Sequence, residues 1–196
     1  EVPKEVFATA FYFHSAELVS KMAKLIDKTE DARKYADLAA AIKEAFNKAY
    51  VTPDGKIKGD TASGYALALD MGLLPDELIK PAVGHMVEAV RRYKDHISTG
   101  FHTTVRLMLQ LTKHGHNKLA YKLINNRTFP SWGYTIDNGA TTIWERWDGY
   151  VKGRGFQDPG MNSFCHYSIG AVAEWMYKTI LGIQIDPANP AYKHFS

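Results

Sequence analysis

Residues 131–149 read SWGYTIDNGATTIWERWDG. This stretch contains three of the four tryptophans of the chain, Trp132, Trp144 and Trp147. It also contains three carboxylates, those of Asp137, Glu145 and Asp148. A sugar ring has apolar C–H faces and a rim of hydroxyls, so a protein binds it by aromatic stacking together with directed hydrogen bonds. The stretch is therefore a candidate sugar pocket, and its tryptophans are candidate substrate-binding residues.

The chain on both sides of this stretch has the pattern of consecutive helices. Apolar residues recur at helical spacing, and short turns separate the periodic segments, which makes neighbouring helices antiparallel. The segments at 62–71 and 164–181 are apolar on more than one face, which suits the inner layer of a two-layered helical array. We expect an all-α fold of helical hairpins. The predicted helices are 4–27, one starting at Thr29, 62–71, one starting at Pro75, 101–113, one ending at Asn125, and 162–181.

Length and composition narrow the class of protein. A chain of 196 residues with 45% hydrophobic residues can form one domain with a real core, or part of a larger domain. The net charge of +3 comes from balanced charges without a long basic run, so nucleic acid is not an expected partner. No apolar run is long enough to cross a membrane. Both ends look cut from a longer chain. The sequence does not decide whether the protein is located in the bacterial cytoplasm, in the periplasm or outside the cell.

Glu145 is the candidate catalytic residue, and its sequence context supports two interpretations. The run from Thr142 to Glu145 fits a capping box, in which the glutamate would only tie back to the cap residue. Alternatively, Glu145 is a carboxylate at a helix start, with Trp144 and Trp147 on either side of it. The helix terminus favours the charged form, which suits a general base or nucleophile. Asp137 and Asp148 lie in turn signatures, for which structural roles are expected.

The histidines support one further candidate and no metal site. His166 lies in a strongly apolar segment, where a lone histidine is usually a core residue. It follows the predicted helix cap Asn162 closely, however, and its imidazole could donate to a sugar hydroxyl if that end faces the pocket. His114 and His116 lack the third ligand that zinc sites need. We predict no metal and no cofactor, because phosphate-loop, serine-hydrolase and zinc-protease motifs are also absent.

Several motifs together resemble the α-L-rhamnosidases of glycoside hydrolase family 78, and the similarity runs over nearly the whole chain. They are GATTIWERWD at 139–148, MNSFCHY at 161–167, GAVAEW at 170–175, and the shorter runs at 98–101, 120–121 and 130–134. The resemblance implies an (α/α)6 toroid with the sugar site at one mouth of an inner ring of helices. It further implies release of terminal α-L-rhamnose with inversion, by a water nucleophile.

The resemblance also implies roles for individual residues. The general base of the family falls on Glu145, and a sugar-contacting histidine falls on His166. Trp132 and Trp144 fall in or beside the pocket. The general acid of the family lies upstream of residue 1, in a motif rich in Asp, Arg and Glu. We therefore expect this chain to carry the general-base half of the site and to be inactive alone.

On this basis residues 1–183 are interpreted as the C-terminal part of a catalytic domain, and residues 184–196 as a linker or the start of a β-domain. The expected partners are a rhamnosylated glycoside or polysaccharide and the remainder of the toroid. A second copy of the chain is also expected, because an incomplete ring exposes apolar surface. Two alternatives stay open: a non-catalytic carbohydrate-binding helical domain, and an (α/α)6 glycosidase of other sugar specificity.

Overall fold

A computed structural model describes residues 2–186 and 191. The described chain is mainly helical, which confirms the all-α prediction, and its two short strands pair only with each other. The chain divides into two compact units, Glu1–Arg92 and Tyr93–Ser196. None of the described helices is apolar over the length that a bilayer crossing requires. Residues 187–190 and 192–196, on which most of the predicted linker falls, lie outside the described part.

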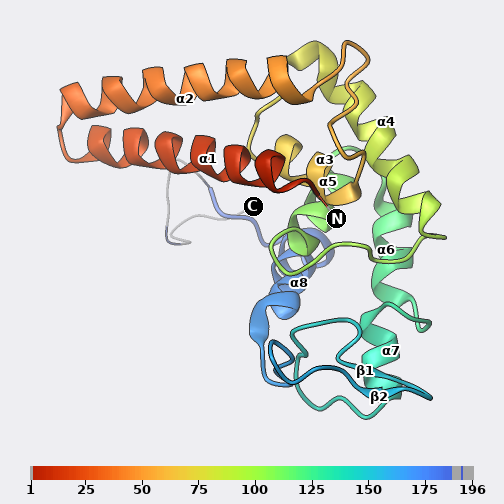
Figure 1. The fold of residues 1–196 in the computed structure, drawn as a ribbon. Helices are drawn as coiled ribbons and strands as arrows, with labels where there is room; N and C mark the ends of the chain where they lie inside the picture. Colours follow the sequence, from red (N-terminus) through yellow and green to blue (C-terminus); the bar gives the residue numbers. More distant parts are fainter. Residues whose placement is uncertain (1, 187–190, 192–196) are drawn as a thin grey trace. The chain divides into compact units, whose positions relative to one another are not determined.

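The first unit begins with a long helical hairpin. Helices α1 (Lys4–Leu25) and α2 (Thr29–Tyr50) lie side by side, as Figure 1 shows. Four of the five buried side chains of α1 are alanine or valine, and such small residues allow close packing of helices. Large apolar side chains of α1 and its end are exposed on the same unit: Tyr12, Leu18, Met22, Leu25 and Ile26.

Helix α3 (Ala62–Asp70) is almost entirely buried and packs against α4 (Asp76–Arg92). The Thr61 hydroxyl caps its start by accepting a hydrogen bond from the Gly64 N–H at 3.2 Å. The chain leaves the helix through Gly72, whose φ of 67° favours glycine. The prediction of a short helix covered on all faces is therefore confirmed within this unit.

The loop before α3 is tied down by one polar cluster. Within this loop, Val51 and Ile57 form an antiparallel β-bridge. The buried Tyr65 hydroxyl donates to Asp60 Oδ1 at 2.6 Å, and Arg92 Nη2 lies 3.2 Å from Asp60 Oδ2. Burial raises the pKa of Asp60, but the Tyr65 hydrogen bond and the Arg92 charge outweigh it and hold that pKa below its usual value.

The second unit is built around α5 (Thr104–Lys113), which packs against α6 (Asn117–Asn125) and α8 (Val172–Trp175). Trp175 is fully buried there, and its indole N–H donates to Thr112 Oγ1 at 2.8 Å. Its ring meets Tyr121 edge to face, with 5.4 Å between the ring centroids. The other elements are α7 (Trp132–Asp137), β1 (Tyr150–Val151), β2 (Gly155–Phe156), a 3-10 helix η1 (Tyr167–Ala171) and a π-helical turn η2 (Met176–Ile180).

Two predicted boundaries in this unit are wrong. The predicted helices leave residues 126–143 outside any helix, but α7 lies there, and it begins because the Ser131 hydroxyl accepts from the Tyr134 N–H at 3.0 Å. The final helix begins at Tyr167 instead of residue 162, and it changes from 3-10 to α to π geometry along its length. The residues before it do not join the helix because their backbone groups pair with residues 142–145.

Candidate functional site

Two loops of the second unit, one before α5 and one before η1, contact each other. Residues 96–103 precede α5, and residues 138–166 precede η1. The Trp147 indole N–H donates to the Thr99 carbonyl at 2.8 Å. The rings of Phe101 and His166 lie against each other, with 5.5 Å between their centroids. Trp147 and His166, which are 19 positions apart, therefore both contact the loop before α5.

Glu145 lies in the second of these loops, and both helix-start interpretations of it are wrong. No helix begins near it, and the Thr142 hydroxyl donates to the Phe164 carbonyl instead of capping a helix. The Glu145 backbone N–H donates to the Ser163 carbonyl at 2.9 Å. In return the Ser163 N–H donates to Glu145 Oε2 at 3.0 Å. This reciprocal pair holds the half-buried Glu145 carboxylate against the segment that contains Ser163.

The Glu145 carboxylate can accept more hydrogen bonds than it receives from the described residues. Within the described part of the chain, Oε2 has the Ser163 N–H as its hydrogen-bond donor, and no cation forms an ion pair with either oxygen. A carboxylate can accept about four hydrogen bonds. Glu145 can therefore still accept a hydrogen bond from a water or a sugar hydroxyl.

His166 is the last residue before η1 and does not lie inside a helix, which corrects its predicted place. Its backbone is extended, and its N–H donates to the Ile143 carbonyl at 2.8 Å. That bond lies in the same pairing that holds Glu145. His166 Nδ1 is buried without a hydrogen-bond partner among the described residues, so Nε2 is the ring nitrogen left to meet a ligand.

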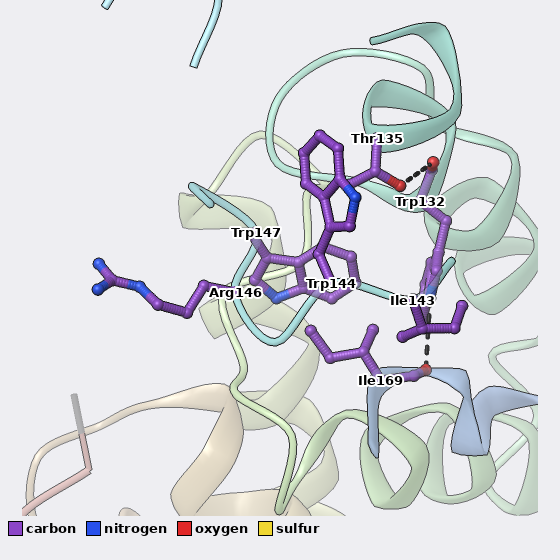
Figure 2. A pocket seen from close by; sticks show the side chains of 7 residues that line it. All are labelled: Trp132, Thr135, Ile143, Trp144, Arg146, Trp147 and Ile169. Carbon is purple, nitrogen blue, oxygen red and sulfur yellow. Dashed lines mark hydrogen bonds between the residues drawn. The ribbon is translucent and has the colours of Figure 1, made fainter. Parts of the chain in front are cut away.

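The three tryptophans of the candidate pocket pack against one another and their neighbours. Trp132 and Trp147 meet edge to face at 5.0 Å between ring centroids, and Trp144 meets Phe164 in the same way at 5.1 Å. Trp132 and Trp144 are only 8% and 7% exposed. These rings lie with Ile143 and Ile169 around one cavity (Figure 2). The volume of this cavity is about 10 Å³, the size of one water molecule. A sugar does not fit between them, and sugar contact by their outer faces stays a prediction.

The other carboxylates of this stretch have partners, in agreement with the structural roles predicted for them. Asp137 forms a bidentate ion pair with Arg127. Asp148 accepts two hydrogen bonds from Arg146, at 2.9 and 2.8 Å. These bonds, together with the charge of Asp148, hold the pKa of Arg146 above its ordinary value. Figure 2 shows the Arg146 guanidinium pointing away from the tryptophans.

Asn162 and Ser163 are site residues whose roles the sequence did not predict. Asn162 was expected to cap a helix, but it is buried and its amide donates to the carbonyls of Gly149 and Gln157. Ser163 acts through its backbone, which leaves no signal in the identity of the residue. In the described chain, no group of three or more His, Cys, Asp or Glu residues is arranged to hold a metal ion.

A second hollow in this unit is larger but lacks catalytic groups. It has a volume of about 370 Å³, and no carboxylate or histidine lines it. Most of its lining is apolar, including Trp132, Ile136, Ile143, Val172 and Met176. This hollow therefore lacks the carboxylate and imidazole groups that act as acids and bases in catalysis.

Comparison with known proteins decides the family. Residues 1–180 match the bacterial alpha-L-rhamnosidase 6 hairpin glycosidase domain. The chain belongs to this family. It is 51% identical, over 98% of its length, to an alpha-L-rhamnosidase of Streptomyces avermitilis, of which it covers 18%. It is 42% identical, over 97% of its length, to an alpha-L-rhamnosidase of Formosa agariphila, of which it covers 20%.

Solved alpha-L-rhamnosidase structures have the same fold. The Streptomyces avermitilis enzyme, complexed with L-rhamnose, aligns over the whole chain with a TM-score of 0.92 and 50% identity; the chain covers 19% of it. The enzyme of Aspergillus terreus aligns over 95% of the chain with a TM-score of 0.86 and 31% identity; the chain covers 21% of it. The predicted six-hairpin glycosidase fold is thus confirmed. The chain spans about one fifth of the length of these rhamnosidases.

Proposed function

We propose that a protein carrying this chain releases terminal α-L-rhamnose from glycosides by an inverting mechanism, with Glu145 as general base. Family membership and the rhamnose complex of the Streptomyces avermitilis relative support the substrate class. The observation that carries the proposal is the state of Glu145. Its carboxylate is fixed by the Ser163 N–H, has no ion pair among the described residues, and shares one backbone pairing with His166.

The proposed reaction is a single displacement at the anomeric carbon. Glu145 accepts a proton from a water molecule, whose oxygen attacks the anomeric carbon while the bond to the leaving oxygen breaks. The leaving oxygen takes a proton from a general acid. Asp137 and Asp148 are engaged by arginines, which supports an acid outside this stretch. His166 Nε2–H donates to a sugar hydroxyl, and Trp132, Trp144 and Trp147 shape the wall around it.

The partners beyond the substrate are also proposals. The remainder of a six-hairpin domain would supply the acid, and residues 1–183 would form the C-terminal part of that domain. The exposed apolar side chains of α1 are compatible with the expected dimer, which stays a prediction.

Glu145→Gln tests this proposal in a protein that carries the complete domain. Glutamine keeps the shape and can still accept the Ser163 hydrogen bond through its amide oxygen, but it cannot take a proton from water. We expect kcat on an aryl α-L-rhamnoside to fall roughly 10²–10⁴-fold with little change in melting temperature. Azide needs no deprotonation, so it should restore bond cleavage and give a glycosyl azide of inverted configuration.

The matched control is Glu174→Gln, because Glu174 is exposed and paired with Lys178 at 2.6 Å. It should leave kcat unchanged. If Glu145→Gln retains a near-normal rate, the base lies elsewhere. If the unaltered protein binds L-rhamnose but cleaves no rhamnoside, the carbohydrate-binding alternative replaces the enzyme.

A further inference from the structure

The segment that positions Glu145 is itself held in place by one buried side chain. Ser163 provides both backbone bonds to Glu145, and the residue before it is Asn162. Asn162 is 9% exposed and is the buried polar side chain of residues 138–166. Burying an amide is unfavourable unless it is hydrogen-bonded, so its contacts identify its function.

The Asn162 amide nitrogen spans the base of the β1–β2 hairpin. It donates to the Gly149 carbonyl at 3.0 Å and to the Gln157 carbonyl at 3.4 Å. Gly149 and Gln157 are themselves joined, because the Gln157 N–H donates to the Gly149 carbonyl at 3.1 Å. Both hydrogens of one amide therefore attach residue 162 to the chain that follows Glu145.

The fit around Asn162 is close. A Cβ atom on Gly149 would lie 2.8 Å from Asn162 Oδ1, so the absence of a side chain at position 149 makes room for the amide. The preceding residue, Met161, has a φ of 124°, which is unfavourable for a residue with a side chain. Backbone strain of this kind persists where the surrounding contacts determine it, and it concentrates at functional sites.

We propose that Asn162 is a positioning residue for Glu145. By fixing residue 162 to Gly149 and Gln157, it sets the place of the Ser163 N–H and carbonyl, and through them the direction of the Glu145 carboxylate. This inference rests on the proposed function, because it gives Asn162 a role in the rate only if Glu145 is the base. A mispositioned base loses its alignment with the water, while the binding of substrate by other residues is kept.

The test is Asn162→Asp in a protein that carries the complete domain, assayed on an aryl α-L-rhamnoside. Aspartate has the shape of asparagine but presents an oxygen to two carbonyls, so both bonds are lost. A displacement of about 1 Å at a reacting group can cost on the order of 10²-fold in rate, so we expect kcat to fall by that factor with KM little changed. Asn162→Ala removes the same two hydrogen bonds without placing a carboxylate beside the two carbonyls. It replaces Asn162→Asp in the test if the aspartate variant does not fold.

Two readouts separate positioning from a general loss of structure. The double variant with Glu145→Gln should be no slower than Glu145→Gln alone, because residues that act as one unit are not additive. Azide should accelerate the Asn162 variant and give the glycosyl azide, because azide needs no base. Asn138→Asp is the matched control: its amide donates to the Tyr134 carbonyl at 2.8 Å, away from the Glu145 pairing, and it should keep kcat.

Wild-type kcat in both Asn162 variants, with Glu145→Gln slow, would overturn this inference and leave the proposed function intact. This inference is also overturned if the fold-losses of kcat in the Asn162 and Glu145 variants multiply in the double variant and azide does not accelerate the Asn162 variant. Glu145→Gln at wild-type rate would overturn both proposals together.

Discussion

Two loops of this molecule each lead into a helix and each contain a half-buried carboxylate, but the two carboxylates have different partners. In the loop before α3, Asp60 accepts from the Tyr65 hydroxyl and pairs with Arg92, and Lys56 lies 3.9 Å from Oδ2. In the loop before η1, Glu145 accepts one backbone N–H and pairs with no cation among the described residues. The first carboxylate has a partner on each oxygen, and the second has a hydrogen-bond donor on Oε2 alone among the described residues.

This difference indicates which carboxylate is structural and which is available for chemistry. A carboxylate whose oxygens are occupied by an arginine and a phenol is stabilised, and it has little capacity left to take a proton from water. One that is held by a single amide is aligned and still open on its other side. We infer that the availability of the carboxylate, more than its burial, distinguishes the Glu145 loop.

The largest expected effect comes from neutralising each carboxylate in turn. Glu145→Gln should lower kcat roughly 10²–10⁴-fold and change the free energy of unfolding little. Asp60→Asn should lower the free energy of unfolding by about 1 kcal/mol, because it breaks a partly exposed ion pair, and should keep kcat. Chemical denaturation and steady-state kinetics measure the two quantities. A loss of stability without a loss of rate in Glu145→Gln would reverse the assignment.

His166→Ala should have the next largest effect. If Nε2–H donates to a sugar hydroxyl, its removal weakens transition-state stabilisation by on the order of 1–3 kcal/mol, with folding largely kept. The ratio of kcat/KM between wild type and variant gives this value. Unchanged kinetics with an equal loss of thermal stability would place the ring in the core with Phe101.

Tyr65→Phe should lower the free energy of unfolding by about 1–2 kcal/mol at neutral pH, because the buried hydroxyl donates to a charged group. The pKa of Asp60 lies below 3.8 in the folded protein. A lowered carboxyl pKa contributes stability that is present above the unfolded value and is lost as pH falls through the folded value. The difference between wild type and variant should therefore shrink below pH 3.8. A difference that is constant with pH would show that Asp60 gains nothing from the phenol.

The smallest effect is expected at Met161. Its side chain is 74% exposed and its φ of 124° suits glycine, so Met161→Gly removes strain and little packing. We expect the free energy of unfolding to rise by less than about 1 kcal/mol. A fall in stability measured by denaturation would mean that the methionine packs against a part of the protein outside this chain.

The regular helices could be predicted from the sequence because their signals are local. The predicted start of α2 at Thr29 and the predicted helix at 62–71 depend on residues within a few positions of one another, and both agree with the structure. The resemblance also identified the family correctly. The site loop could not be predicted in this way. Thr142 and Glu145 satisfy a capping pattern, but residues 163–166 bind this segment from 18 to 23 positions away, and such pairing leaves no periodicity.

The same reason explains the errors at the final helix. Asn162 is a strong cap by residue type, but the carbonyls of Gly149 and Gln157 compete for its amide in the folded chain. The three predicted pocket tryptophans, Trp132, Trp144 and Trp147, line one cavity, while their contact with a sugar stays a prediction. The closeness of packing between the three tryptophan rings depends on the tertiary structure, so it cannot be predicted from the residue types.

The most direct test of Glu145 as the activator of water is the configuration of the first sugar released. An aryl α-L-rhamnoside is hydrolysed by the protein that carries the complete domain, and proton NMR follows the anomeric signals before mutarotation. Inverting glycosidases place water between the base and the anomeric carbon, so attack comes from the face opposite the leaving group. The proposed mechanism predicts β-L-rhamnose as the first product. If α-L-rhamnose appears first, the reaction retains configuration, and Glu145 is not the base that activates water in a single displacement.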